Sequence, residues 1–245
     1  NAVRDSEGSF SARISGLIPE TEYEYRLAVT ALDGGAEETM DAQNTITTDR
    51  AVPVPNGGFE TTSNDESSKY KSFYDPSSPD ETLKSKWWDN GNAGSTMVGS
   101  SSVICYPDAS DKKDGSQSVC LQSRFVAGVK FAAGNLFCGY FGGTIGTSGG
   151  KVFFGRPFTA RPTALKFWMK YSGGVINRES SNVPDDGKKG NYDKAMIRVA
   201  LGTWDYKKYG GDADSPVLVN TTDESTFVDF STDASTIALG EKIVS

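Results

Sequence analysis

Short segments of the chain alternate hydrophobic and polar residues with a period of two, and this pattern predicts β-strands. Between residues 22 and 29, Tyr23 and Tyr25 share one face while charged residues occupy the other. The same alternation recurs in residues 165–171 and 195–201. Clusters of Gly, Pro, Ser, Thr and Asn separate these segments. The sequence therefore predicts an all-β protein with many turns.

Residues 165–171 provide the first candidate for binding. We expect their odd-numbered apolar residues in the core, and Lys166 and Trp168 on the outer face. If residues 195–201 form a neighbouring antiparallel strand, Arg198 shares that surface. An exposed indole can stack on the apolar face of a sugar while basic groups bond its hydroxyls and favour an acidic sugar. The alternative is that Trp168 packs under a loop or against a neighbouring module.

Two further tryptophans are candidates for ligand contact. Trp204 lies in a polar loop after the strand 195–201, and binding residues concentrate on such loops. Trp87 and Trp88 are adjacent in a strand-like segment, so one ring should face the core and the other the surface. We take Trp88 as the candidate for the outer face, with a core position as the alternative.

Composition and charge exclude several classes of function. The 245 residues contain no histidine, which excludes Ser-His-Asp catalysis and histidine-ligated zinc. The net charge is −7, from 25 basic and 32 acidic residues, which disfavours nucleic-acid binding. No apolar run is long enough for a transmembrane segment. A glycoside hydrolase needs only two carboxylates, so composition does not exclude this class of enzyme. Asp205, beside Trp204, is the nearest candidate acid.

The three cysteines, Cys105, Cys120 and Cys138, are too few for a disulfide framework. Cys105 and Cys120 flank residues 108–115, which we interpret as a hairpin turn. Paired strands could bring these two cysteines within bridging distance, but disulfides between adjacent strands are strained. We therefore expect free thiols, with a Cys105–Cys120 disulfide as the alternative.

The N-terminal segment resembles part of a fibronectin type III domain. Residues 17–23 read Leu-Ile-Pro-Glu-Thr-Glu-Tyr, which is similar to the L-x-P-x-T-x-Y tyrosine corner of that family. The resemblance implies a smaller, partial immunoglobulin-like sandwich over residues 1–50, with its first strands before Asn1. Residues 51–55 form a Pro-rich linker, and residues 56–245 form a second domain.

The second domain opens with Asn-Gly-Gly-Phe-Glu at residues 56–60. This motif is similar to the start of many jelly-roll carbohydrate-binding modules. The resemblance implies that Glu60 and nearby carbonyl oxygens hold a structural calcium ion, which prefers several hard oxygen ligands. In such modules an aspartate pair on the last strand completes the site, and the segment that ends at Ser245 has no such pair. The alternative is that Glu60 bonds to a turn.

Four segments together carry the main resemblance: residues 87–92, 115–121, 133–141 and 155–171. The last, with its G-R-P-F-T-A-R-P-T-A-L-K-F-W-M-K-Y sequence, is the most distinctive. Over about residues 54–245 the chain resembles the putative carbohydrate metabolism domain of bacterial cell-surface proteins. This family implies a jelly-roll β-sandwich outside the cell, associated with glycan use. Compared with the family, we expect the C-terminal strands of the sandwich to be missing from residues 56–245.

The sequence therefore predicts a non-catalytic glycan-binding module that uses exposed aromatics on a β-sandwich. The resemblance implies a location at the bacterial surface, in the periplasm or outside the cell, with a lipid anchor upstream of this chain as one arrangement. A structural or adhesive module that docks other proteins is the alternative. A glycoside hydrolase is a third hypothesis.

Overall fold

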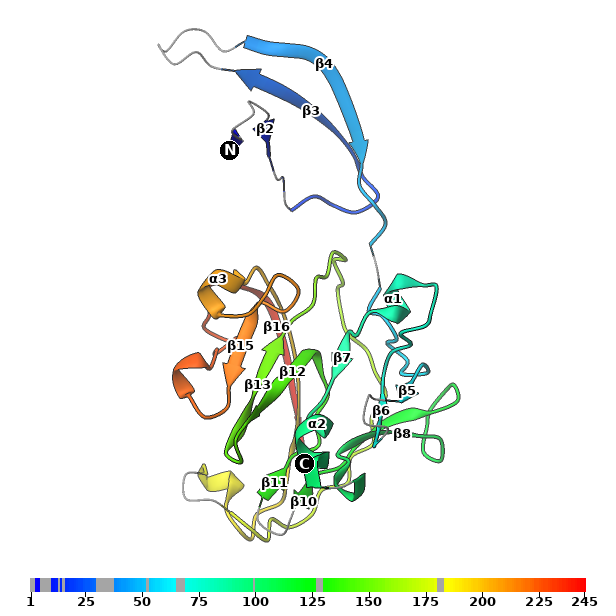
Figure 1. The fold of residues 1–245 in the computed structure, drawn as a ribbon, viewed down its shortest axis with the longest axis vertical. Coiled ribbons are helices and arrows are strands. Elements are labelled where there is room, and N and C mark those ends of the chain that lie inside the picture. The colour runs from blue at the N-terminus through cyan, green and yellow to red at the C-terminus, as the bar shows by residue number, and fades with distance from the viewer. Residues whose placement is uncertain are drawn as a thin grey trace. The chain divides into compact units, whose positions relative to one another are not determined.

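The computed structural model describes all residues except 1–2, 5–9, 13, 15, 30–37, 52, 65–68, 99, 127–129 and 180–182. The described residues form an all-β protein with several antiparallel sheets and short helices, as the sequence predicts (Figure 1). The chain divides into two compact units. The first comprises Asn1–Val54 with Phe158–Thr163, and the second Pro55–Pro157 with Ala164–Ser245.

The described residues of the first unit form two antiparallel strand pairs. Their bounds are β1 (Val3–Arg4), β2 (Phe10–Ser11), β3 (Glu22–Val29) and β4 (Glu38–Thr47). The Tyr23 hydroxyl accepts a hydrogen bond from Ile18 N at 2.8 Å, and Thr48 Oγ1 donates to Ile18 O at 2.6 Å. This closure of the turn before β3 is the contact expected of a tyrosine corner. The fibronectin-like assignment itself stays a prediction.

The largest sheet of the second unit has four antiparallel strands in the order β15–β13–β12–β7 (Figure 1). Their bounds are β7 (Trp88–Asp89), β12 (Phe137–Ile145), β13 (Gly149–Phe154) and β15 (Val217–Asn220). β12 and β13 form a hairpin, which the short turn after Ile145 closes. A bulge between Phe141 and Gly143 shifts its register.

The remaining strands of this unit pair two by two, and all these pairs are antiparallel. They are β5 (Ser63–Asn64) with β6 (Lys71–Ser72), β8 (Cys105–Asp108) with β9 (Ser118–Leu121), β10 (Arg124–Val126) with β11 (Lys130–Ala132), and β14 (Ala195–Gly202) with β16 (Thr236–Val244). The strand predicted at residues 195–201 is thus confirmed. Its expected inward face is only partly confirmed, because Ile197 is half-buried while Val199 is exposed.

Helices are short. The α-helices are α1 (Glu81–Lys84), α2 (Asn92–Ser95) and α3 (Tyr206–Tyr209), and the 3-10 helices are η1 (Thr96–Val98), η2 (Ser100–Ser102), η3 (Asp185–Gly187) and η4 (Glu224–Thr226). In the part of the chain that is described, no helix reaches the length and hydrophobicity that a bilayer crossing requires.

The buried apolar residues of the second unit lie on or next to β6, β8, β10 and β15. The buried apolar side chains among the described residues are Phe73, Ile104, Cys105, Val126 and Val217. Phe59 extends this core, because its ring meets Phe73 at 5.7 Å and Trp88 at 5.2 Å between centroids. Such tilted and edge-on contacts are the favourable arrangement for aromatic rings.

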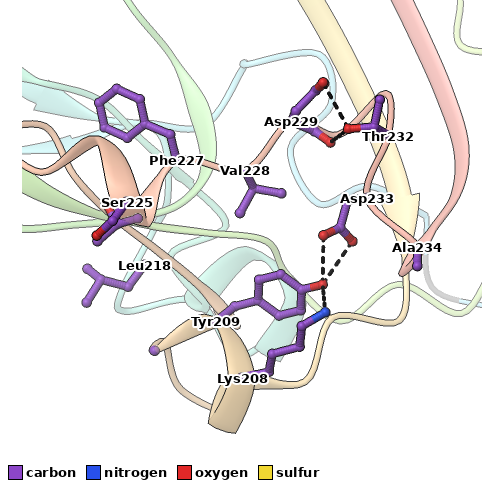
Figure 2. A pocket seen from close by; sticks show the side chains of 12 residues that line it. Lys208, Tyr209, Leu218, Ser225, Phe227, Val228, Asp229, Thr232, Asp233 and Ala234 are labelled. Carbon is purple, nitrogen blue, oxygen red and sulfur yellow. Dashed lines mark hydrogen bonds between the residues drawn. The ribbon is translucent and has the colours of Figure 1, made fainter.

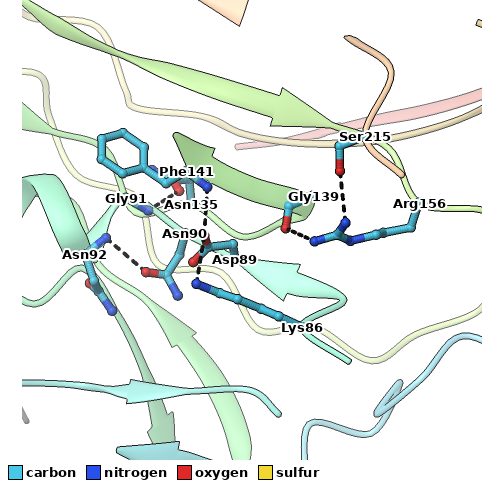
Figure 3. A network of polar contacts seen from close by, with 10 residues as sticks. All are labelled: Lys86, Asp89, Asn90, Gly91, Asn92, Asn135, Gly139, Phe141, Arg156 and Ser215. Atoms are coloured by element: carbon cyan, nitrogen blue, oxygen red, sulfur yellow. Dashed lines mark hydrogen bonds and ion pairs between the residues drawn. The ribbon is translucent and has the colours of Figure 1, made fainter. Parts of the chain in front are cut away.

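One asparagine connects α2 to β8 through buried hydrogen bonds. Asn92 is fully buried, and its Oδ1 accepts from Ile104 N at 2.8 Å and from Cys105 N at 3.2 Å. Its Nδ2 donates to Cys105 O at 2.7 Å. Figure 3 shows that Asn90 in turn accepts from the backbone of Asn92. The buried amide therefore satisfies backbone groups that would otherwise lack partners.

Charged side chains hold the large sheet at two further points (Figure 3). Asp89 is buried, accepts from Phe141 N at 2.7 Å and pairs with Lys86 Nζ at 3.1 Å. Arg156, just after β13, donates to Gly139 O at 3.2 Å and to Ser215 Oγ at 3.1 Å. Asp89 and Arg156 belong to the segments 87–92 and 155–171 that carry the family resemblance, so part of these segments stabilises the fold.

The cysteines are free thiols, as predicted. In the β8–β9 pair Cys105 lies opposite Leu121, and Tyr106 lies opposite Cys120. Because neighbouring residues on a strand face opposite sides, this register places the Cys105 and Cys120 side chains on opposite faces. Burial raises the pKa of Cys105, and it raises the pKa of Cys138 to about 11, so neither is a reactive thiolate at neutral pH.

Candidate functional site

Trp168 lies fully on the surface, with 77% of the residue exposed. The strand predicted for residues 165–171 is wrong, because these residues belong to no strand or helix. The predicted inward face is wrong as well, since Leu165, Phe167 and Met169 are exposed. Alternation defines an inner face only where a partner strand and a covering layer are present. The expected exposure of Trp168 nevertheless agrees with the structure.

The loop between β8 and β9 meets Trp168. Lys113 Nζ lies 4.6 Å from the centre of the Trp168 ring, within the range of a cation–π contact. Lys170 Nζ pairs with Asp111 Oδ2 at 2.6 Å, and this hydrogen bond raises the pKa of Lys170. Lys166 is also exposed. We call Asp111, Lys113, Lys166, Trp168 and Lys170 the Trp168 surface.

The contribution of the β8–β9 loop was missed at the sequence level. The sequence predicts only a hairpin turn at residues 108–115, which the antiparallel β8–β9 pair confirms. Their contact with Trp168 joins segments far apart in the chain, and no local pattern signals such a contact. What the sequence did contain is the pair of lysines on either side of Trp168.

Arg198 is not joined to the Trp168 surface. A shared surface requires residues 195–201 to pair with 165–171, and this condition is not met, because β14 pairs with β16 and residues 165–171 form no strand. Arg198 lies opposite Glu241 on β16, and the two side chains form an ion pair at 2.6 Å. Among the described residues, no hydrogen bond, ion pair or ring contact joins Arg198 to Trp168.

The other two candidate tryptophans are half-buried and packed against neighbouring residues. The Trp204 ring meets Phe230 edge-on at 5.4 Å and covers Gly202. The Trp88 ring packs on Phe59, and its Nε1 donates to Pro55 O at 2.9 Å. Both rings are therefore less accessible for stacking on a sugar than the exposed Trp168 ring.

Glu60 fixes the opening motif of the second unit to the β8–β9 loop. Its Oε2 accepts hydrogen bonds from Ser116 N at 2.8 Å and from Ser116 Oγ, and these bonds hold the pKa of Glu60 below its usual value. Gln117 Nε2 donates to Phe59 O at 2.6 Å in the same contact. The described residues include no group of three acidic, cysteine or histidine side chains able to hold a metal. Backbone carbonyl oxygens also bind calcium, so the ion implied for Glu60 and its neighbouring carbonyls stays a prediction.

A cavity of about 620 Å³ lies beside α3, η4 and the turn before β16 (Figure 2). The Tyr209 hydroxyl donates to Asp233 at 2.8 Å and accepts from Lys208 Nζ at 2.8 Å. The bond from Tyr209 lowers the pKa of Asp233, and bonds from Ser231 lower that of Asp229. Both carboxylates are therefore ionised hydrogen-bond acceptors at neutral pH.

The comparison with protein families decides the relationship of this chain. The family described as putative carbohydrate metabolism domain matches residues 58–238, which is well over half of the 245 residues. The chain belongs to this family. Searches of curated proteins and of solved structures returned no match. Membership relates the second unit to carbohydrate metabolism, and most of the Trp168 surface lies on segments that carried the resemblance.

Proposed function

We propose that the domain binds glycans without cleaving them, and that the Trp168 surface is the site of contact. The observation that carries the proposal is the exposed Trp168 ring, backed by Lys113 at 4.6 Å. When the C–H face of a sugar covers a large apolar ring, apolar surface leaves water, and this burial favours binding. Ammonium groups of Lys113, Lys166 and Lys170 supply donors and Asp111 supplies an acceptor for sugar hydroxyls.

The carboxyl groups support binding rather than hydrolysis. A glycosidase needs one carboxylic acid whose pKa is raised, so that it can protonate the leaving oxygen. The described carboxyl groups with a shifted pKa all shift downward, including Asp229 and Asp233 in the cavity. Asp205, the candidate acid beside Trp204, is the exposed cap of α3, where it accepts from Lys207 N at 3.0 Å.

The variant Trp168→Ala tests the proposal. Because the ring is exposed, its loss should leave the melting temperature nearly unchanged. Binding to a recognised polysaccharide, measured by affinity electrophoresis, should weaken at least about tenfold, as for an aromatic hot spot. Phe131→Ala is the matched control, because Phe131 on β11 is also well exposed (67%) and lies outside the Trp168 surface; its binding should be unchanged.

Two results would overturn the proposal. Equal binding by Trp168→Ala and the unmodified protein would remove the ring from the site. A large loss of stability in Trp168→Ala would make the ring structural. If no polysaccharide binds at all, the protein-docking role considered from the sequence takes the place of glycan binding.

A further inference from the structure

A second concave surface lies between the β5–β6 hairpin and β8. This groove has a volume of about 420 Å³, within the range of about 300–1,000 Å³ found for small-molecule sites. Alternation along the strands shapes it. On β6, Lys71 is exposed while Ser72 is buried; on β8, Cys105 is buried while Tyr106 lines the groove. The remaining lining residues are Asn64, Lys69, Tyr70, Val103, Pro107 and Arg124.

The groove is basic although the protein is acidic. Its lining has Lys69, Lys71 and Arg124 and no carboxylate, whereas the whole chain carries −7. None of the three forms an ion pair among the described residues. Asp65 and Glu66, between β5 and β6, lie outside the described residues, so this charge balance covers the lining alone. Three cations in a groove whose described lining holds no carboxylate create a local attraction for anions.

The Arg124 guanidinium is held in place with donors to spare. Its Nε donates to Val103 O at 2.7 Å, and its Nη2 donates to Gln122 Oε1 at 2.6 Å. A guanidinium has five N–H donors, so three stay available for a ligand. Tyr106 Oη donates to the same Gln122 oxygen at 3.1 Å, which places a tyrosine ring beside the arginine. A fixed fork next to a ring suits a carboxylate or sulfate attached to an apolar-faced sugar.

We infer that this groove is a second binding site, and that it takes an anionic saccharide unit, either a uronic acid or a sulfated sugar. The inference rests on the proposed glycan-binding function and specifies the class of glycan. Arg124 and Lys71 bind the anionic group, and Lys69 adds charge while its Nζ donates to Thr96 O at 3.1 Å. Tyr106 provides a surface for the sugar ring.

Matched pairs of polysaccharides test this site. The probes are polygalacturonate against its methyl ester, and dextran sulfate against dextran, measured by affinity electrophoresis at low and high salt. An acidic member should bind more tightly than its neutral partner, and salt should weaken that preference. Lys71→Gln should weaken binding of the acidic member by roughly tenfold and leave the neutral member unchanged.

Lys151→Gln is the matched control. It removes the same charge from an exposed position on β13, outside the groove, and should leave every affinity unchanged. Equal losses of affinity in Lys71→Gln and Lys151→Gln would show that net charge alone decides binding. Equal affinity for the acidic and neutral members of each polysaccharide pair would overturn the site directly. Polyglutamate is the probe for charge without sugar. If polyglutamate binds through Lys71 as tightly as the acidic glycan, the assignment of a saccharide ligand is overturned.

The two proposals fail in different ways. Trp168→Ala should weaken acidic and neutral glycans alike, whereas Lys71→Gln should affect the acidic ones only. If the protein binds neutral glycans through Trp168 and shows no preference for the acidic members, the proposed function stands and the groove is not a binding site. The absence of binding by every probe, acidic and neutral, would overturn both.

Discussion

At the scale of single residues, Trp168 and Tyr140 show two different uses of an aromatic side chain. Trp168 presents its ring to solvent, with Lys113 lying over it. Tyr140 stacks on Phe153 with ring centres 4.5 Å apart and donates its hydroxyl to Asp212 at 2.7 Å. The first arrangement leaves the ring open to a ligand, whereas the second fixes the sheet to the loop before β15.

The Tyr140–Asp212 hydrogen bond makes stability depend on pH at both ends of the scale. Burial and Asp212 raise the pKa of Tyr140 from 10.0 to about 12. Its contribution is therefore complete below pH 10 and is lost as the pH rises toward 12. The bond from Tyr140 lowers the pKa of Asp212 below 3.8, so the contribution of that carboxylate is complete above this value and is lost as the pH falls through its lowered pKa.

Tyr140→Phe should remove both effects. We expect it to cost about 2 kcal/mol at neutral pH, because one hydrogen bond to a charged group is lost. The difference in unfolding free energy between the two proteins, measured by urea denaturation, should shrink between pH 10 and pH 12. NMR titration should show the pKa of Asp212 closer to its usual value. Parallel stability curves up to pH 12 would contradict this assignment.

At the scale of elements, prediction succeeded for the turn at residues 108–115 and for the strand at residues 195–201. The hairpin at residues 105–121 was predicted from its turn, and β8 and β9 are found there. Prediction failed at residues 165–171, where alternation implies a strand. These residues form no strand, and Leu165 and Phe167 are exposed. The register that separates Cys105 from Cys120 was also beyond sequence reasoning, because a shift of one residue reverses every face.

Within the β12–β13 hairpin, two glycines provide a matched test of close backbone packing. Gly139 and Gly143 both have positive φ, at 135° and 121°, so a side chain is strained at either position. A Cβ at Gly139 would overlap Phe153 O, whereas nothing lies within 4 Å of one at Gly143. Gly143→Ala should cost about 1 kcal/mol from backbone strain alone.

Gly139→Ala should cost roughly 3 kcal/mol, because the strand pairing must also shift. Thermal and urea denaturation of both variants measure the difference. Equal losses in the two variants would show that β13 does not approach Gly139 as closely as the hairpin requires.

At the scale of the whole molecule, the candidate sites depend on contacts that the sequence could not supply. Family resemblance and alternation indicated an all-β protein related to carbohydrate metabolism, and the structure and the family comparison agree. The contact between the β8–β9 loop and Trp168, and the groove between β6 and β8, arise from segments that fold together at long range. For the same reason Arg198 and Trp204, chosen for local pattern, lie in other contacts.

The central claim is that this acidic, all-β domain binds glycans and does not cleave them. The most direct measurement is an array of plant, host and microbial glycans probed with the intact protein, with and without calcium, and scored also for released reducing sugar. We predict reproducible binding of at least one glycan, with no reducing sugar released. Release of reducing sugar, or the absence of binding across all three classes of glycan, would contradict the claim.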